Sequence, residues 1–357
     1  MGNFGFIIHP LCISDFSRKF PLAQKLPEKF IKKIMEKLPP VKVSRITGIK
    51  SETGSAEGCF VAVPLLPEQM LGLPTELVID KILKACRLAR DMGAQVVGLG
   101  AFTSVVGDKG LSIARGIDIP VTTGNSYTVA TALETVRRAC QATGRALEDA
   151  QIVIVGANGS IGSTCARILS REARFMTLVS RDTERLENLA AEIMRETGLA
   201  VHTTNRPEGP LKRADIVITV SSSVDTIIFP EHLKKGAIVC DVARPRDVSA
   251  QVAKTRKDVL IIEGGVVKVP GDVNFNFNFG LPPGMCYACM AETMILAMEG
   301  RFENFSIGSR LEMEKVNEIW KLGEKHGFTL AGIRGPEGFT AYSQLGRNAA
   351  KYSPKAR

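Results

Sequence analysis

QIVIVGANGSIGSTCARILS, residues 151–170, is the stretch of sequence that decides the fold. The run IVIV (152–155) predicts a buried strand, and a glycine turn then leads into a helix near residues 160–171. Gly156, Gly159 and Gly162 have GxxGxxG spacing, which suits a tight turn, a close backbone approach and close helix packing. The free N–H groups of such a helix start attract phosphate. We therefore predict a dinucleotide site. Its expected contacts are Gly156, Asn158, Gly159, Ser160, Ile161 and Gly162. The alternative is a glycine turn that serves packing alone.

Strand-like and helix-like segments alternate downstream of this unit. Further strands are predicted near residues 175–180, 200–203, 215–220, 237–241 and 258–262. Alternating strands and helices favour a parallel, doubly wound sheet, so we predict an α/β protein with a Rossmann-type domain. We expect an N-terminal α/β substrate domain over residues 1–145, to which the resemblance described below adds carrier docking, and the Rossmann domain over 146–270. The C-terminal segment, 271–357, is expected to pack its helices back against the first domain.

The end of the second Rossmann strand predicts the choice of cofactor. An acidic residue there would bind a ribose hydroxyl and repel a 2′-phosphate, but this strand ends in Ser180-Arg181. A hydroxyl and a guanidinium suit a phosphate dianion, so NADPH is favoured over NADH. Asp182 would weaken that preference if it turned inward. The alternative for Arg181 is a solvent-exposed charge at a helix start.

Two cysteines follow a proline-rich break, in PPGMCYAC (282–289). We expect Cys286 and Cys289 in the first turns of a helix, where the thiolate form is favoured. Three interpretations remain open from these residues: a catalytic nucleophile, a CxxC redox or metal pair, and two small buried hydrophobic side chains. Metal is disfavoured because the chain has no second CxxC and no paired histidines. The stripe Met290, Met294 and Met298 is expected to be core.

Positive charge is concentrated near the start of the chain, which has a net charge of +9. Residues 27–38 predict a helix with Phe30, Ile31, Ile34 and Leu38 on one side and four lysines on the other: Lys29, Lys32, Lys33 and Lys37. More basic residues stand near the C-terminus: Arg347, Lys351, Lys355 and Arg357. Such a segment suits an acidic protein or a membrane surface, or it is simply solvated. Nucleic acid is disfavoured because no zinc-finger spacing or RNA-binding aromatic motif is present.

Cysteine usage and hydropathy predict the cellular compartment. Eight cysteines are scattered through predicted helices and strands rather than framing short loops, which indicates a reducing compartment. No apolar run approaches the roughly 18 residues of a spanning helix, and the start of the chain lacks the features of a secretory signal. We therefore expect a cytoplasmic protein.

Several stretches together resemble the long-chain acyl-[acyl-carrier-protein] reductase family, whose members form fatty aldehydes. The matching segments are FGFIIHP (4–10), GLGAFTSVV (98–106), TTGNSYTVATA (122–132), VGANGSIGS (155–163), EGGVVKVPGD (263–272) and YACMAETMILAMEGRFENFSIG (287–308). The resemblance implies transfer of an acyl group from acyl carrier protein, or from acyl-CoA, to an enzyme cysteine, followed by reduction with NADPH. Tyr287-Ala288-Cys289 before Ala291-Glu292 matches the family's nucleophile segment, which places that role on Cys289. The glycine turn matches the family's NADPH site, and an acidic carrier protein is the partner implied for the basic segment.

Two loops after predicted strands supply candidate polar contacts to substrate: Thr103, Ser104, Asn125, Ser126 and Tyr127. The alternative for Asn125 or Ser126 is capping of the following helix. The sequence departs from the family at three points. Tyr127 stands where histidine is expected, the 272–289 stretch is shorter, and Cys286 is an addition. These differences concern the substrate pocket and the acyl chain length.

Two other functions remain open from the sequence. A shikimate- or quinate-type dehydrogenase would also place a substrate domain before a dinucleotide domain, yet it would need no cysteine at the nicotinamide. A non-catalytic NADPH-binding adaptor would use its cysteines only for structure.

Overall fold

The computed structural model describes residues 2–19, 26–223, 225–331, 333–335, 338–340 and 352. The fold is α/β, as predicted, with a six-stranded parallel sheet, a mixed N-terminal sheet and C-terminal helices. The chain divides into two compact units. Unit 1 comprises Met1–Tyr127, Lys268–Ser309 and Glu318–Thr329, and unit 2 comprises Thr128–Val267, Arg310–Asn317 and Leu330–Arg357. Unit 1 is therefore built from three separate stretches of sequence.

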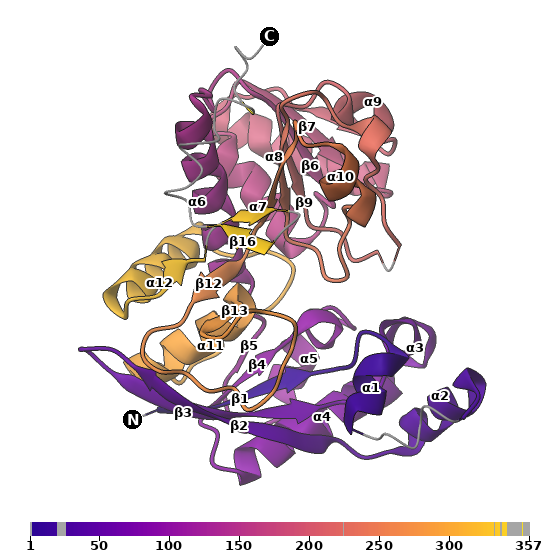
Figure 1. Cartoon of the computed structure of the whole chain (residues 1–357), viewed down its shortest axis with the longest axis vertical. Coiled ribbons are helices and arrows are strands. Elements are labelled where there is room, and N and C mark those ends of the chain that lie inside the picture. The colour runs from indigo at the N-terminus through magenta and orange to yellow at the C-terminus, as the bar shows by residue number, and fades with distance from the viewer. Residues whose placement is uncertain are drawn as a thin grey trace. The chain divides into compact units, whose positions relative to one another are not determined.

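Unit 1 contains a five-stranded mixed sheet (Figure 1) with the order β2-β3-β1-β4-β5. Its strands are β1 (Gly2–Ile8), β2 (Val41–Lys50), β3 (Ser55–Ala62), β4 (Val96–Leu99) and β5 (Val121–Thr122). Strands β3, β1, β4 and β5 run parallel, and β2 pairs antiparallel with β3 at one edge. Its other elements are α1 (Ile13–Lys19), α2 (Glu28–Lys37), α3 (Pro67–Gly72), α4 (Thr75–Asp91), the 3₁₀ helix η2 (Ala101–Ser104), α5 (Leu111–Arg115), β13 (Met285–Tyr287) and α11 (Ala288–Glu299).

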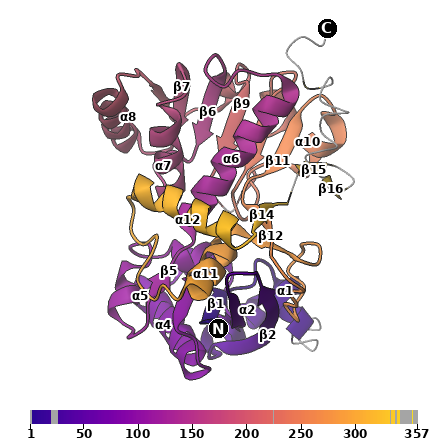
Figure 2. The same ribbon diagram turned by 90° about the vertical axis from the view of Figure 1, so that its left-hand side faces the viewer.

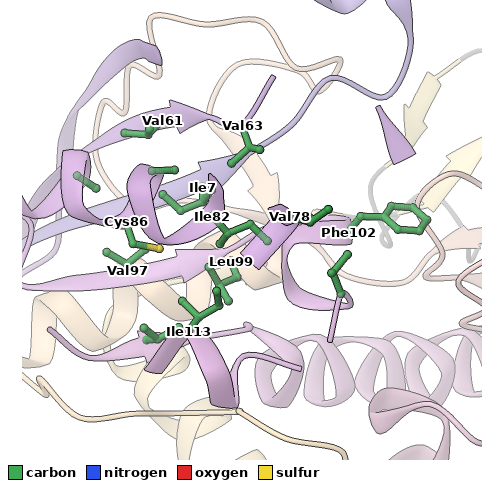
Figure 3. Packing of buried hydrophobic residues seen from close by; sticks show 14 of the residues in the cluster. Ile7, Val61, Val63, Val78, Ile82, Cys86, Val97, Leu99, Phe102 and Ile113 are labelled. Atoms are coloured by element: carbon green, nitrogen blue, oxygen red, sulfur yellow. The ribbon is translucent and has the colours of Figure 1, made fainter. Parts of the chain in front are cut away.

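One face of this sheet is covered by α4. Val78, Ile82 and Ala89 recur on the buried side of the helix and meet strand residues such as Ile7 and Val97. Figure 3 shows these apolar side chains interleaved between helix and strands. The apolar residues of α4 recur with helical spacing and those of the strands alternate, so both sets point into one core between the helix and the sheet.

The opposite face of the sheet carries α11, which contacts β1, β3 and β4. Two glycines allow the close approach. A Cβ on Gly98 would lie 2.1 Å from Thr293 Oγ1, and one on Gly2 would lie 1.9 Å from the Ala297 carbonyl oxygen. Rings from β1 and β3, including Phe6 and Phe60, fill this face, with the two centroids 6.3 Å apart. The methionine stripe of α11 is buried, which confirms that it is core.

Helix α2 differs from the prediction at one residue of its apolar side. Ile31 and Met35 are buried against Phe16 and Leu66, whereas Phe30 is 54% exposed. The prediction that Phe30 lies on the apolar side is therefore wrong. Tertiary contacts decide the orientation: Lys32 pairs with Glu68 of α3 at 2.6 Å, and the Gln69 amide donates to the Lys32 carbonyl oxygen at 3.0 Å.

Unit 2 contains the predicted Rossmann-type sheet (Figure 2), with the order β11-β10-β9-β6-β7-β8. Its strands are β6 (Gln151–Val155), β7 (Phe175–Val179), β8 (His202–Thr204), β9 (Ile216–Thr219), β10 (Ile238–Asp241) and β11 (Leu260–Glu263). All five pairings are parallel. The strand order reverses between β6 and β9, and α/β sheets of this kind bind ligands beyond the carboxyl ends of the strands at that point.

The helices of unit 2 connect these parallel strands. They are α7 (Ser160–Leu169), α8 (Thr183–Thr197), α9 (Glu208–Leu211), the 3₁₀ helix η3 (Pro230–His232) and α10 (Ala250–Thr255). Six further elements complete the chain: α6 (Asn125–Thr143), β12 (Val266–Lys268), α12 (Met313–Lys325), β14 (Thr329–Leu330), β15 (Ile333–Gly335) and β16 (Gly338–Thr340). Among the residues that the structure describes, no helix is both long and apolar enough to cross a bilayer. The basic residues Arg347, Lys351, Lys355 and Arg357 lie outside the described residues.

Candidate active site

The glycine turn of unit 2 has the geometry of a phosphate-binding loop. Gly156 has a φ of +82°, and its N–H donates to the Val179 carbonyl oxygen at 2.9 Å. Helix α7 begins at Ser160, directly after Gly159. A Cβ on Gly162 would lie 2.4 Å from the Gly156 carbonyl oxygen, so this position requires glycine. The bare backbone and the free helix start fit the phosphates of a dinucleotide.

The loop after β9 meets this turn at the strand reversal. A Cβ on Gly156 would lie 2.9 Å from the Ser221 backbone nitrogen. Ser221 is in turn held by the buried Asp247, which accepts its N–H at 3.0 Å and its hydroxyl at 2.5 Å. Asp247 also accepts the Thr219 hydroxyl. Sequence reasoning missed Asp247, because nothing in the polar stretch RPRDVSA (244–250) distinguishes it from an exposed carboxylate.

The end of β7 carries the residues that were expected to select between NADPH and NADH. Arg181 is exposed, and Asp182 caps α8 by accepting the Arg185 N–H at 3.1 Å. The Asp182 carboxylate thus has a structural role. Arg185, one helical turn after Arg181, donates through Nη2 to the Asn158 carbonyl oxygen at 3.3 Å. A second guanidinium therefore lies beside the glycine turn, which the sequence analysis did not identify.

The two cysteines of the CxxC pair lie in different environments. Cys286 is in β13 rather than in the helix, which begins only at Ala288, so the expected placement of both thiols in helical turns is wrong for Cys286. The reason is that residues 285–287 are extended as β13 before the helix starts. Cys286 is fully buried, and desolvation raises its thiol pKa well above the ordinary value. Cys289 is partly exposed and is the second residue of α11.

Five of the six remaining cysteines are buried like Cys286. Desolvation raises the thiol pKa of Cys59 and Cys140 to about 11 and that of Cys86 and Cys165 to about 12. Cys240 is buried as well, and Cys12 is exposed near the start of α1. Because the thiolate is the reactive form, the six buried thiols are poor nucleophiles. Cys289 alone combines partial exposure with the first turn of a long helix.

The loop between β5 and α6 lies directly on Cys289. Gly124 has a φ of +74°, and a Cβ there would lie 2.2 Å from Cys289 Cα and 2.4 Å from Cys289 Cβ. The Tyr127 N–H of the same loop donates to Glu292 of α11 at 2.7 Å. The structure thus brings the 122–127 loop and the candidate nucleophile together within unit 1.

The five candidate substrate contacts are placed differently from one another. Thr103 and Ser104 donate their hydroxyls within their own turn, to the carbonyl oxygens of Gly100 and Ala101 at 2.8 and 2.7 Å. Helix α6 begins at Asn125, so Asn125 and Ser126 both lie in its first turn. In the described part of the chain, the buried Ser126 hydroxyl has no hydrogen-bond partner.

Tyr127 is a core residue in this structure. Its ring stacks on Trp320 with centroids 6.2 Å apart and meets Phe328 edge-on at 6.5 Å. Desolvation raises the pKa of its hydroxyl. Tyr127 therefore contributes an aromatic ring to the packing of α12.

His9, which the sequence analysis did not select, holds the 100–104 turn. Its Nε2 accepts the Phe102 N–H at 3.1 Å, and its Nδ1 lies 3.0 Å from the Pro10 carbonyl oxygen. A carbonyl only accepts, so Nδ1 carries the proton. Burial lowers the pKa of His9 to about 4, which keeps the ring neutral and Nε2 an acceptor at neutral pH. His9 therefore orders the turn after β4 rather than serving as a base.

Comparison with known proteins agrees with the assignment of unit 2. The family model of shikimate / quinate 5-dehydrogenase matches residues 138–262. Unit 2 is an NAD(P)-binding domain of the dehydrogenase and reductase type. The solved quinate dehydrogenase from Corynebacterium glutamicum, in complex with NAD, is 14% identical with a TM-score of 0.35, covering 72% of this chain and 86% of that chain.

Two curated relatives extend the similarity beyond unit 2. Aminotransferase PigE from a Serratia species is 31% identical over 337 residues, which cover 91% of this chain and 39% of that protein. The chain therefore spans well under half the length of PigE. The long-chain acyl-[acyl-carrier-protein] reductase of Synechococcus elongatus is 29% identical over 306 residues, covering 81% of this chain and 87% of that protein. The chain thus contains an NAD(P)-binding domain and is distantly similar to the acyl-carrier-protein reductase.

Proposed function

We infer that this chain reduces a fatty acyl thioester, carried by acyl carrier protein or coenzyme A, to a fatty aldehyde. The observation that carries this proposal is the environment of Cys289, a partly exposed thiol at the start of α11 beneath the Gly124 main chain. A thiol in the first helical turn is favoured as thiolate, and thiolates attack thioesters. The similarity to the Synechococcus reductase, over 81% of this chain, supports the same chemistry.

The proposed reaction has two covalent steps at Cys289. First, the sulfur forms a bond to the acyl carbon, and the carrier leaves as its thiol after taking a proton. Bound NADPH would then supply a hydride to the acyl carbon. The bond between that carbon and Cys289 breaks, the aldehyde leaves, and Cys289 regains its proton. One thioester, one NADPH and one proton thus give one aldehyde, one carrier thiol and NADP⁺.

The direct test is incubation with NADPH and acyl-CoA or acyl carrier protein, followed by detection of aldehyde. Aldehyde formation supports the proposal. Oxidation of shikimate or quinate with NADP⁺, without aldehyde from thioesters, would instead support the small-molecule dehydrogenase that the family match leaves open. Cofactor binding with neither reaction would support a non-catalytic adaptor.

Cofactor choice is expected to depend on Arg181. Arg181→Ala should weaken NADPH binding by about 1.5–3 kcal/mol through loss of charge-assisted hydrogen bonds to the 2′-phosphate, while NADH affinity changes little. Titration of each cofactor against the variant, followed by fluorescence, measures both values. Arg174→Ala is a matched control, because Arg174 precedes the amino end of β7 and pairs with Glu148 at 2.5 Å. If Arg181→Ala loses the same affinity for NADPH and for NADH, Arg181 does not recognise the 2′-phosphate.

The basic segment, helix α2 (Glu28–Lys37), is proposed to dock an acidic acyl carrier protein. Phe30 is exposed on α2, and Lys29, Lys33 and Lys37 are exposed on the same short helix. No ion pair of these three lysines occurs among the described residues, whereas Lys32 is bound to Glu68. Opposite charge raises association rates, and an exposed aromatic ring supplies an apolar anchor.

Changing Lys29, Lys33 and Lys37 together to glutamine is expected to weaken acyl carrier protein binding at low salt by about tenfold, because several opposite charges are lost. The difference should shrink at high salt, since screening shortens electrostatic reach to about 8 Å at physiological ionic strength. A variant with Lys212, Lys235 and Lys254 of unit 2 changed to glutamine has the same net charge and should bind normally. If both variants bind acyl carrier protein equally well, the lysines of α2 serve solubility only. If the wild type is retained on anionic vesicles, they contact a membrane.

A further inference from the structure

Glu292 is a charged residue in the middle of an otherwise apolar helix. It stands in α11, ACMAETMILAME, and its exposed fraction is 0%. Desolvation raises the pKa of its carboxyl group. A carboxylate taken out of water is unstable unless donors surround it, so its partners decide its state and its use.

Four donors from two separate segments converge on this carboxyl group. The Thr122 hydroxyl donates to Oε1, and the Tyr127 N–H donates to Oε2 at 2.7 Å. The Ser306 hydroxyl and the Gly124 N–H also bond to the carboxyl group, and each of these bonds lowers its pKa. A carboxylate can accept all of these donors, whereas a protonated acid or an amide would set a donor against one of them.

The two hydroxyl groups are themselves oriented by the loop. Thr122 Oγ1 accepts the Gly124 N–H at 3.1 Å, and Ser306 Oγ accepts the Ser126 N–H at 3.1 Å. Each hydroxyl oxygen therefore accepts one backbone N–H, and its own proton is directed to Glu292. The Thr123 hydroxyl donates to the Ser306 carbonyl oxygen as well, which joins the 122–127 loop to the segment around residue 306.

This network ends at the candidate nucleophile. Glu292 lies three residues after Cys289, so the two side chains leave neighbouring positions on the helix surface. The loop that Glu292 holds presses the Gly124 main chain onto the Cys289 backbone, with no room for a Cβ. The position of the loop against Cys289 thus depends on a fully buried carboxyl group.

We propose that Glu292 is a positioning residue for Cys289, acting as a buried carboxylate that fixes the 122–127 loop against the thiol. The acyl-transfer part of this inference rests on the proposed function, whereas the part on thiol reactivity does not. A carboxylate near a thiol also opposes thiolate formation. Under this proposal Glu292 has two separable effects: its negative charge disfavours a second negative charge on the neighbouring thiol, and its hydrogen bonds hold the loop that lies against Cys289.

The test is Glu292→Gln, followed by two measurements on Cys289. Iodoacetamide labelling, mapped to the Cys289 peptide across a pH series, gives the thiol pKa. Acyl-CoA added without NADPH, followed by intact mass spectrometry, gives the rate of adduct formation. We expect the labelling midpoint to move to lower pH because the charge is gone, while adduct formation slows by at least about tenfold because the site geometry is lost. A merely structural residue would lower stability without moving the midpoint.

Two further variants keep the inference falsifiable. Glu299→Gln removes another carboxylate of α11, one paired with Lys325 at 2.5 Å, and should leave both the midpoint and the adduct rate as in the wild type. If Glu292→Gln does not fold, Ser306→Ala removes one donor and leaves the carboxylate, and it should slow adduct formation with the midpoint retained. Wild-type midpoint and rate in Glu292→Gln, or a wild-type rate in Ser306→Ala, would overturn the inference. If iodoacetamide labels Cys289 of the wild type but acyl-CoA never acylates it, the proposed function is contradicted instead. The shift in the labelling midpoint of Glu292→Gln would then be the test of the role of Glu292.

Discussion

Cys289→Ala is expected to abolish both acyl-adduct formation and aldehyde production while leaving NADPH affinity unchanged. The thiol is the atom that accepts the acyl group, so its removal should cost on the order of 10³-fold or more in rate. Cofactor affinity should persist because the glycine turn that would hold the phosphates belongs to unit 2. Alanine is small enough for a site where the Gly124 main chain leaves little space.

Intact mass spectrometry checks this prediction directly. Without NADPH, the wild type should gain one acyl group from acyl-CoA, and peptide mapping should place it on Cys289. Cys286→Ala is the matched control, since the buried Cys286 thiol is expected to take no part. A label on Cys286, or thioester reduction by Cys289→Ala at near the wild-type rate, would assign the reaction to another group.

Gly124→Ala is expected to destabilise unit 1 and to disable the same thiol. The new Cβ would overlap Cys289 Cα and Cβ, and the residue would keep a left-handed backbone that alanine disfavours. The backbone and packing penalties together suggest about 2–5 kcal/mol. A displaced helix start should also slow adduct formation by about a hundredfold, because small misplacements have large effects on reactivity.

A matched glycine separates the two causes in this prediction. Gly144 also has a positive φ, +65°, yet nothing lies within 4 Å of its missing Cβ. Gly144→Ala should therefore lower stability by only about 1–2 kcal/mol and leave the thiol reactive. Urea unfolding and the adduct rate measure both effects. Equal behaviour of the two variants would mean that the contact with Cys289 is of no consequence.

The Rossmann-type sheet could be predicted from the sequence nearly strand by strand. Buried parallel strands are continuous apolar runs, such as IVIV before Gly156, and the glycine spacing fixes the turn that follows. The N-terminal sheet was harder to predict. β1 contains Gly2 and Gly5, and its parallel partners β3 and β4 lie far along the chain, so no local pattern indicated the strand.

The candidate site was predictable only in part for a similar reason. The family resemblance pointed to Cys289, but the sequence did not show that the next cysteine upstream lies in a strand. Nor did it predict that Gly124 lies on Cys289, since 165 positions separate them. Glu292 did leave a local signal, because it is the one carboxyl group between Cys289 and Met298 in a helix of apolar side chains. Its partners, however, are known only from the fold.

The interrupted sequence of unit 1 has a consequence for how the chain is made. The sheet face bearing Phe6 and Phe60 is covered by α11, and Ala288, where α11 starts, is 226 positions beyond Ala62, where β3 ends. At about 5–20 residues per second, a ribosome needs roughly 10–45 s to cover that distance. During that time the aromatic face is open to solvent and to other nascent chains. Helix α11 is thus synthesised long after the strands whose aromatic face it covers. Chaperones that bind exposed aromatic surface can act on the growing chain during this interval.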